Sequence, residues 1–225
     1  MSKKPPLTVP LLENGDRLSR HEFERRYDAM PELKKAELIE GVVYVPAAVR
    51  IVNHGRPHAQ IMGWLLAYQA VTPGVDIGDN ATVRLDRDNE PQPDGLLRIA
   101  PEVGGNSRIS DDGYVEGAPE LIVEIAASSV SIDMNAKLNV YRRNGVQEYL
   151  VWRVNDDELD WFTLQNDQYV ALEPNAEGIV QSQVFPGLWL AVEALLEGDL
   201  ANVLAELQRG TAAAEHQAFV ERLRG

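Results

Sequence analysis

Two acidic residues and one lysine in this sequence have the types and positions that metal-assisted chemistry needs. Glu124 interrupts the apolar run 121–126, which predicts a strand buried on both faces. An ionised carboxylate there costs on the order of several kcal/mol unless a basic side chain or a bound cation compensates its charge. Asp94 stands directly before a second apolar run, and Lys137 lies one predicted helix beyond Glu124. Together they are the minimum set for metal-assisted cleavage of a phosphodiester bond.

The alternation of side chains along a strand determines whether two carboxylates can meet. If the strands next to Asp94 and Glu124 are neighbours in one sheet, both carboxylates point into one notch. They would bind Mg²⁺ or Mn²⁺ there, because these hard cations prefer oxygen ligands at about 2.0–2.2 Å. The backbone carbonyl of Ile125 is expected as a further ligand. The metal would polarise a phosphate oxygen and lower the pKa of the attacking water.

Two further side chains complete the predicted catalytic set of Asp94, Glu124, Lys137 and Glu37. The ammonium group of Lys137 would stabilise the nucleophile or the additional negative charge of the transition state. Glu37, on an early predicted hairpin, would hold a second metal ion or orient the water. The predicted metal ligands are Asp94, Glu124 and Ile125.

Glu124, Asp94 and Lys137 each also have a structural interpretation that involves no metal. Glu124 could be a buried acid paired with Lys137 or Arg142, and Asp94 taken alone is typical of a turn. Asp133 and Lys137 are four residues apart, which predicts a surface ion pair worth roughly 0.3–0.5 kcal/mol on a helix.

The remaining polar candidates have simpler interpretations. Glu37 could serve as a cross-strand partner within its hairpin. His54 and His58 are four residues apart, but Gly55 and Pro57 interrupt the helical face that they would share. We therefore predict no zinc pair. His58, near a helix start, either approaches the site or caps the helix, and we favour the cap.

The composition is that of an ordinary globular protein, with 225 residues, 44% hydrophobic and 25% charged. The absence of cysteine excludes disulfides and thiolate zinc sites. The net charge of −14 is unfavourable for binding nucleic acid, which usually needs a basic face. However, the charge is distributed unevenly along the chain. Residues 1–60 carry 10 basic and 8 acidic side chains, residues 61–150 carry 7 basic and 14 acidic, and residues 151–225 carry 4 basic and 13 acidic.

This distribution predicts where a phosphate-facing surface would lie. It should draw on the first third of the chain and on three basic residues of a later helix, Lys137, Arg142 and Arg143. The acidic remainder predicts either weak, salt-sensitive affinity for DNA or no binding of DNA at all.

No stretch of the sequence predicts a membrane or export segment. Prolines interrupt residues 1–10, where a signal peptide would need an apolar core, and no run approaches the roughly 18 apolar residues of a membrane span. We therefore expect a cytoplasmic protein with no membrane partner.

Hydrophobic periodicity and turn residues predict one α/β domain. A capping box, Ser19-Arg-His-Glu22, opens a helix that runs to about Met30. Further helices are predicted after Pro57, over 133–143 and from Val192 onward. The predicted strands are a hairpin over 36–45 that turns at Glu40-Gly41, short strands within 75–86, and strands over 95–99, 120–126, 147–153, 158–164 and 167–172. Residues 101–119 are expected to be a long polar loop, and the four tryptophans are expected in the core.

Short motifs occur along the chain in a specific order. They are Glu37-Leu-Ile-Glu-Gly41, His58, Pro93-Asp94, Glu124 with Ser129, Asp133 through Lys137 to Tyr141, Gly145-Val-Gln-Glu-Tyr149 and Phe185-Pro-Gly187. In this order the chain resembles the Uma-two family of restriction-endonuclease-like nucleases, from about residue 20 to 197. The resemblance implies a PD-(D/E)XK fold of the α/β class, with a restriction-endonuclease-like mixed central sheet flanked by helices and with N-terminal helix and hairpin additions. It also implies a homodimer.

The resemblance assigns roles to the same residues. It implies Asp94 and Glu124 as metal carboxylates, and Lys137 as a lysine that has migrated to the next helix, since Ala126 stands at the usual lysine position. The sequence departs from the family after the glutamate, where Ala127-Ser-Ser129 replaces the frequent Ser-Pro-Ser. This departure removes no expected ligand.

We predict a flexible arm over residues 1–15, a nuclease domain over 16–197 and a C-terminal helical tail over 198–225. The predicted function is that of a Mg²⁺-dependent endonuclease, or one that uses Mn²⁺, that hydrolyses DNA phosphodiester bonds. One alternative is a catalytically silent binding or interaction module with the same PD-(D/E)XK fold, which the acidic charge favours. Another is hydrolysis of a different phosphate ester.

Overall fold

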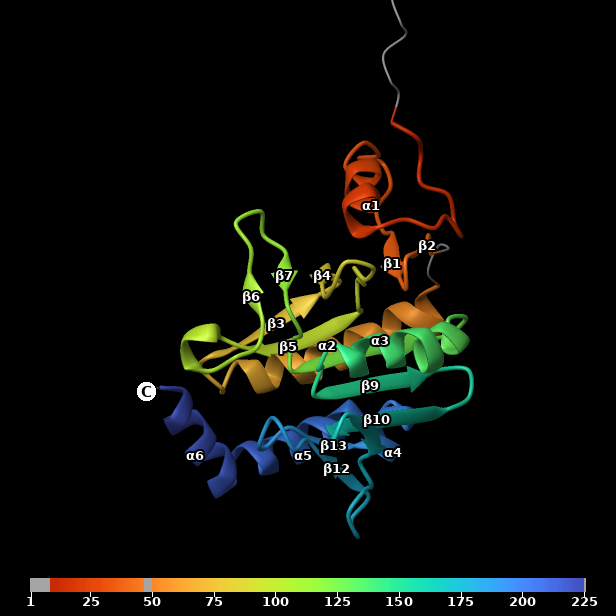
Figure 1. Cartoon of the computed structure of the whole chain (residues 1–225). Coiled ribbons are helices and arrows are strands. Elements are labelled where there is room, and N and C mark those ends of the chain that lie inside the picture. Colours follow the sequence, from red (N-terminus) through yellow and green to blue (C-terminus); the bar gives the residue numbers. More distant parts are fainter. Residues whose placement is uncertain (1–8, 47–49, 225) are drawn as a thin grey trace, which may run out of the picture.

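A six-stranded mixed sheet forms the centre of the protein in the computed structural model, which describes residues 9–46 and 50–224 (Figure 1). The spatial order is β11-β10-β9-β8-β5-β3. The strands are β3 (Val75–Asp79), β5 (Gly95–Ile99), β8 (Leu121–Ala126), β9 (Glu148–Arg153), β10 (Glu158–Gln165) and β11 (Gln168–Ala171). β8 and β9 run parallel, and the other neighbouring pairs in this sheet are antiparallel. This arrangement confirms the predicted α/β class with a mixed central sheet.

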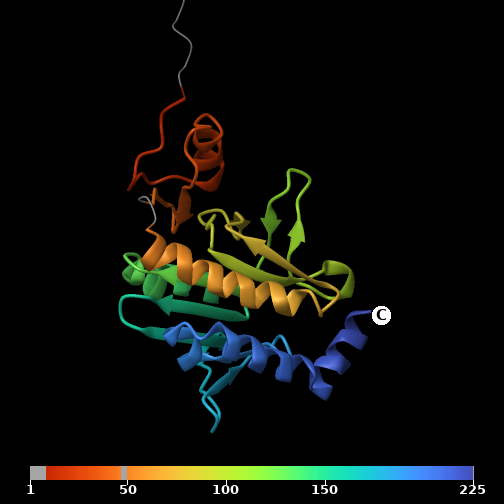
Figure 2. The same ribbon diagram turned by 180° about the vertical axis from the view of Figure 1, so that it is seen from behind.

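Helices cover both faces of this sheet. On one face lies α3 (Leu138–Arg143), preceded by the π-helical turn η3 (Ile132–Lys137). On the other face α2 (Arg56–Gln69) lies beside α5 (Leu200–Thr211), as Figure 2 shows. As predicted, the chain is helical from Val192, in α4 (Val192–Glu197), α5 and α6 (Ala214–Leu223).

The central strand β8 is buried along its whole length, as predicted, because each of its faces packs against a separate apolar layer. Leu121, Val123 and Ile125 belong to the larger core, with α2 and the C-terminal helices. Ile122 and Ala126 belong to the smaller core, with α3. Side chains alternate along a strand, so the residue between Val123 and Ile125 projects toward α3. That residue is Glu124.

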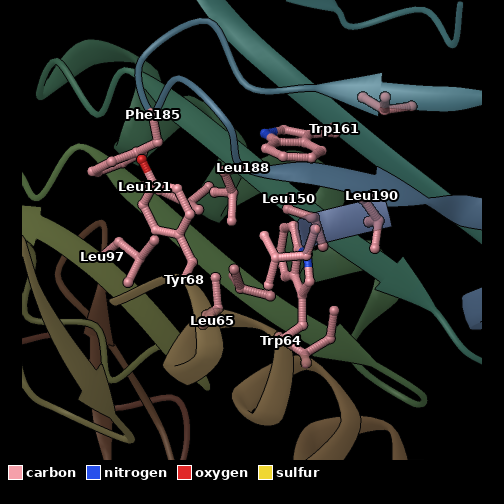
Figure 3. Packing of buried hydrophobic residues seen from close by; sticks show 14 of the residues in the cluster. Trp64, Leu65, Tyr68, Leu97, Leu121, Leu150, Trp161, Phe185, Leu188 and Leu190 are labelled. Atoms are coloured by element: carbon pink, nitrogen blue, oxygen red, sulfur yellow. The ribbon is translucent and has the colours of Figure 1, made fainter. Parts of the chain in front are cut away.

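The larger core joins the sheet to the helices through bulky side chains (Figure 3). It contains Trp64, Leu65 and Tyr68 from α2, Leu97, Leu121 and Leu150 from the sheet, and Val203, Leu207, Phe219 and Leu223 from the last two helices. Three of the four tryptophans are buried as predicted, whereas Trp189 is half-buried. The C-terminal helices therefore contribute directly to this core.

A smaller unit stands out from the central sheet (Figure 1). It consists of α1 (Arg20–Tyr27), β1 (Glu37–Ile39) and β2 (Val42–Tyr44) around a small apolar core. The hairpin turns at Glu40 and Gly41, whose φ angles of 53° and 72° are the left-handed values of a two-residue type I′ turn. These are the predicted N-terminal additions. Residues 1–8 of the predicted flexible arm lie outside the described residues, and Leu12 in its remainder is buried in this unit.

Two local predictions are wrong. Ser19 precedes α1, but its side chain makes no capping bond; Glu22 instead accepts hydrogen bonds from Arg25 and Arg26, and the helix ends at Tyr27. The expected polar loop over 101–119 holds a 3₁₀ turn, η2 (Pro101–Val103), and two short strands, β6 (Arg108–Ile109) and β7 (Val115–Glu116). β7 pairs with β6 on one side and with β4 (Val83–Arg84) on the other. A further hairpin of β12 (Ile179–Gln181) and β13 (Trp189–Ala191) completes the strands described.

Glu90 lies buried where the N-terminal unit meets the rest of the protein. Its neighbours are Glu24 of α1 and Arg84, whose Nε lies 2.9 Å from Glu24 Oε1 and 3.9 Å from Glu90 Oε2. Burial, reinforced by the Glu24 carboxyl group, raises the pKa of Glu90 to about 8. The folded protein therefore keeps a proton on Glu90 that the unfolded chain releases near its ordinary pKa of 4.5.

This difference predicts a pH-dependent effect of the substitution Glu90→Gln. Since the folded state holds the additional proton, the free energy of unfolding of the native chain should fall as pH rises from about 4.5 to about 8 through this group. A glutamine cannot ionise, so the variant should lose less stability than the native chain between pH 5 and pH 9. Urea denaturation at both pH values measures the difference, and equal losses in the two proteins would contradict this account.

No helix in the part of the chain that the structure describes is long and apolar enough to cross a membrane.

Candidate active site

Asp94 and Glu124 come from neighbouring strands, as the predicted site requires. In the antiparallel pair of β5 and β8, Gly95 lies opposite Val123, so Asp94 stands one step further along, at the level of Glu124. Asp94 Oδ2 accepts the backbone N–H of Ile125 at 2.7 Å, which fixes the carboxyl group against β8. Asp94 is 4% exposed and Glu124 is 3% exposed, so both acids are held away from bulk water.

Lys137 lies at the centre of the carboxylates. Its Nζ is 2.9 Å from Glu124 Oε1, 2.9 Å from Glu37 Oε1 and 3.5 Å from Asp133 Oδ1. Glu37 reaches it from the hairpin of the N-terminal unit, and the backbone N–H of Gln92 donates to Glu37 Oε1 at 2.7 Å. The structure thus brings together the four side chains that the sequence singled out.

The alternative of a surface ion pair between Asp133 and Lys137 holds only in part, because the two side chains pair at 3.5 Å but both are buried. The Lys137 ammonium pairs with carboxylates inside the protein, including that of Glu124. Tyr141 of α3 contacts the same carboxylate by donating its hydroxyl to Glu124 Oε1 at 2.8 Å. Of the two basic partners considered for Glu124, Lys137 is the one that contacts it. Arg142 instead donates a hydrogen bond to the backbone carbonyl of Asp167.

The charges in this pocket perturb one another strongly. Burial raises the pKa of Glu124 to about 8; Lys137 opposes this rise, while Asp133, Asp94 and Glu37 add to it. Burial alone would lower the pKa of Lys137, but the surrounding carboxylates outweigh it and hold that pKa well above its usual value. The lysine is consequently charged at neutral pH.

The formal charges of the pocket do not cancel if every group is ionised. Glu37, Asp94, Glu124 and Asp133 are four carboxyl groups, and Lys137 supplies one ammonium group. A second ammonium, that of Lys35, lies 3.5 Å from Asp94 Oδ1. If all are ionised, four negative and two positive charges leave an excess of −2, which one divalent cation would neutralise.

The donor chemistry of the pocket suits a hard cation, although the carboxylates are not gathered around an ion. Within residues 9–46 and 50–224, no group of three His, Asp or Glu side chains is clustered tightly enough to hold a metal. Glu124 Oε1 instead receives Lys137 and Tyr141. Carboxylate oxygens are nevertheless the ligands that Mg²⁺ and Mn²⁺ prefer, so the residues match such an ion by chemical type.

His54 is a neighbour of the site that sequence reasoning missed. The expectation that it shares no helical face with His58 is wrong, because the π-helical turn η1 (Ile51–Gly55) continues directly into α2. Pro57 lies in the first turn of α2, where proline is tolerated. The two imidazole rings stack with their centroids 5.7 Å apart.

Both histidines contact the segment that carries the acids. His54 Nδ1 lies 3.3 Å from the carbonyl oxygen of Ile125, and its Nε2 lies 3.4 Å from Asp94 Oδ1. For His58 the less favoured of the two interpretations, approach to the site, agrees with the structure, since its Nε2 lies 3.0 Å from the backbone carbonyl of Asp94 and 3.0 Å from Asp79 Oδ1. The signal for His54 in the sequence was its spacing of four from His58.

The two π-helical segments of the described chain both carry residues of this site. η1 holds His54, and η3 holds Asp133 and Lys137. Wide helical turns of this kind are rare and occur frequently at functional sites. Their position supports the interpretation of this pocket as the functional centre.

The predicted phosphate-facing surface is only partly available. Lys137 is buried among carboxylates, Arg143 pairs with Glu40 at 2.9 Å, and Arg142 is held by a backbone carbonyl. In the first third of the chain, Arg50 and Arg56 are exposed on either side of η1. The exposed basic side chains next to His54 in the sequence are therefore freer than those of Lys137, Arg142 and Arg143.

Comparison with known proteins identified a family and a similar fold. A family model described as "Uma2: Putative restriction endonuclease" matches residues 20–193. A crystal structure described as "a putative nuclease belonging to DUF820 from Anabaena variabilis" has a similar fold, with a TM-score of 0.58 and 13% sequence identity. The alignment covers 77% of this chain and 96% of that chain. The search of curated proteins gave no match.

Proposed function

The chain belongs to the Uma2 family of restriction-endonuclease-like proteins, and on that premise we propose that it is a metal-dependent endonuclease that hydrolyses DNA phosphodiester bonds. The observation that carries the proposal is the convergence of Asp94 and Glu124 from neighbouring strands, with the Lys137 ammonium 2.9 Å from the Glu124 carboxylate. An acid pair with an adjacent lysine is suited to phosphodiester hydrolysis because each charge acts on the phosphate or on the water.

In this proposal the carboxylates of Asp94 and Glu124 hold the cation. A bound Mg²⁺ or Mn²⁺ supplies Lewis-acid polarisation of the phosphate and a lowered pKa of the attacking water. Ile125 N–H and Tyr141 OH hold the two carboxyl groups in place through hydrogen bonds of 2.7 and 2.8 Å. The chain itself therefore fixes the position of both acids before substrate arrives.

Lys137 and Glu37 act on the water and on the developing charge. Lys137 stabilises the additional negative charge of the transition state through its ammonium group. Glu37, 2.9 Å from that ammonium, keeps the lysine charged and orients it or the water. Since Lys137 contacts three carboxylates, part of this network must open for the ammonium to reach a phosphate.

The substrate in this proposal is DNA, bound with low affinity. The net charge of −14 opposes binding to a polyanion, so exposed cations near the site, including Arg50 and Arg56, carry most of the attraction. Binding should weaken steeply as salt rises. We also propose a homodimer, which light scattering would test.

A second function is favoured by one observation. Lys137 already neutralises part of the charge on Glu37, Glu124 and Asp133. These carboxylates can therefore stay buried in the folded protein without a metal. A chain of this kind could be a binding module that retains the fold and does not cut. It would bind partners through the same pocket with no dependence on divalent ions.

Incubation of the purified protein with supercoiled plasmid separates the two functions. We expect nicking in Mg²⁺ or Mn²⁺ that EDTA abolishes and that returns when the ion is restored in excess. Ca²⁺ in place of Mg²⁺ serves as a control for non-specific ionic effects. Absence of nicking with either Mg²⁺ or Mn²⁺, combined with absence of their binding in calorimetry, would leave the binding module as the function.

A further inference from the structure

We propose that Lys35 is a further catalytic residue, whose ammonium group contacts the phosphate that the protein cleaves. This inference rests on the proposed function and deepens it, because it names the side chain that meets the reacting group when DNA binds. Lys137, the lysine expected from the sequence, cannot make that contact while its three carboxylates surround it. Lys35 needs no such opening of the network.

One side of the pocket is closed to solvent. It holds Lys137 with Glu37, Glu124 and Asp133, and the side chains of these four residues are at most 9% exposed. Tyr141 is buried beside them and donates its hydroxyl to Glu124. A phosphate is a strongly hydrated anion, so it cannot enter this side without displacing these groups and losing its water.

The other side of the pocket, at Asp94, is reached by solvent. Asp94 Oδ2 is held by the backbone N–H of Ile125. Its Oδ1 lies 3.5 Å from Lys35 Nζ and 3.4 Å from His54 Nε2. The side chains of Lys35 and His54 are 26% and 20% exposed. This side is therefore the one that the phosphate of a duplex can approach.

The ammonium group of Lys35 is held loosely. Its contacts with Asp94 Oδ1 and Asn80 Oδ1 measure 3.5 and 3.4 Å, whereas a strong charge-assisted hydrogen bond is about 2.7–2.9 Å long. Lys137, by contrast, makes two contacts of 2.9 Å. An ammonium group has three N–H donors, so Lys35 can donate to a phosphate oxygen without first losing a short hydrogen bond.

The chain around Lys35 aims its side chain at the pocket. Lys35 and Glu37 both contact the pocket, whereas Ala36 between them packs in the small core of the N-terminal unit. Lys34, on the other side of Lys35, is exposed. This alternation is that of an extended chain. The segment that positions Glu37 on the closed side therefore also positions a base on the open side.

An ordinary ion pair with Asp94 is the competing interpretation of Lys35. A partly exposed pair with atoms 3.5 Å apart contributes little to stability, and the N–H of Ile125 already holds the Asp94 carboxyl group. A phosphate oxygen that replaces Asp94 Oδ1 as the partner of Lys35 gains a charge-assisted contact. The exchange also leaves Oδ1 without its ammonium partner, so substrate binding prepares this carboxylate for a cation.

Substitution of two neighbouring lysines tests the proposal. Lys35→Met and Lys34→Met each remove one positive charge and keep the apolar stem, but Lys35 contacts the pocket and Lys34 is exposed. We expect Lys35→Met to slow plasmid nicking in MgCl₂ by about 10–100-fold, because a donor to the developing charge is lost. Lys34→Met should change the rate by less than about twofold. Lys35→Arg, which keeps the charge, should recover part of the lost rate.

Binding of a fluorescent DNA duplex gives a readout that does not depend on cleavage. Anisotropy is measured at several NaCl concentrations, in a constant concentration of CaCl₂ in place of MgCl₂. One lysine–phosphate contact contributes about one unit to the steepness with which the logarithm of the affinity falls against the logarithm of the salt concentration. Lys35→Met should lose about that unit, whereas Lys34→Met and Lys35→Arg should keep the native slope. Urea denaturation midpoints equal to that of the native chain show that each variant is folded.

The two readouts together decide the role of Lys35. Slower nicking by Lys35→Met with an unchanged salt slope would mean that the lysine acts on Asp94 alone. A reduced slope with native nicking would mean that it meets a phosphate that is not cleaved. Either result, or equal behaviour of the two methionine variants, overturns the inference, while the proposed function survives if the native chain nicks plasmid and Glu124→Gln does not. Failure of the native chain to nick plasmid would overturn both proposals.

Discussion

Replacing Lys137 with methionine is expected to lower the free energy of unfolding by about 3–5 kcal/mol, the usual cost of leaving buried charge without its partner. The ammonium group contacts the carboxylates of Glu124, Glu37 and Asp133, and all four residues are more than nine-tenths buried. Methionine keeps the length and the apolar stem of the side chain, so the change is mainly one of charge. Urea denaturation at pH 8, followed by tryptophan fluorescence, measures the effect.

Several controls separate this loss from an ordinary packing defect. Lys34→Met removes an exposed lysine and should change stability by less than about 0.5 kcal/mol. The double variant Lys137→Met with Glu124→Gln should recover part of the loss, because one of the unpaired acids is gone. The loss should also be smaller at pH 5, where the carboxylates take up protons more readily. A change below about 1 kcal/mol at pH 8 would show that the acids are already protonated in the native protein.

The largest effect on activity is expected from Glu124→Gln, which should reduce plasmid nicking by at least about 100-fold. The amide keeps the shape of the side chain and can still accept the hydrogen bonds of Lys137 and Tyr141, so the fold should persist. It cannot supply the negative charge that the cation needs. Rates of nicking at saturating Mn²⁺, together with circular dichroism as a check on folding, measure the change.

Glu148→Gln is the matched control for this substitution. Glu148 is also fully buried, on the neighbouring strand β9, but its carboxylate accepts hydrogen bonds from Ser182, Gln183 and Val184 instead of facing the site. This variant should be less stable and should still cut DNA at close to the native rate per folded molecule. If both glutamine variants cut equally well, Glu124 is a structural acid and the nuclease proposal fails.

The convergence of Asp94 and Glu124 could be predicted because a charged residue in a strand buried on both faces has few possible partners. An apolar run such as 121–126 must lie in the centre of a sheet, and a charged residue within it must find a partner nearby. The position of Glu37 was equally predictable, since the turn at Glu40-Gly41 fixes the register of its hairpin. These elements follow from local rules.

The environment of Lys137 could not be predicted from its spacing. Asp133 and Lys137 are four residues apart whether they lie on a surface or in a core, and the sequence does not show which face of the helix meets the sheet. That face is set by packing against β8 and by the carboxylate of Glu37, which lies one hundred residues earlier in the chain. Burial, and not spacing, gives the lysine its role.

His54 was missed for a different reason. Gly55 and Pro57 suggested an interrupted helix, whereas the chain forms a π-helical turn that runs into α2 and keeps both histidines on one side. The rules for helix interruption describe α-helices, and a wider turn does not obey them. The short strands within 101–119 were missed because two-residue strands carry too little periodicity to recognise.

The origin of Glu37 in an outlying unit links the movement of that unit to the pocket. Its carboxylate is attached to a hairpin that lies outside the central sheet, yet it contacts the same ammonium as Glu124 does. A displacement of α1 and its hairpin would therefore move Glu37 and change the contacts of the Lys137 ammonium. The N-terminal unit is in this way mechanically coupled to the pocket.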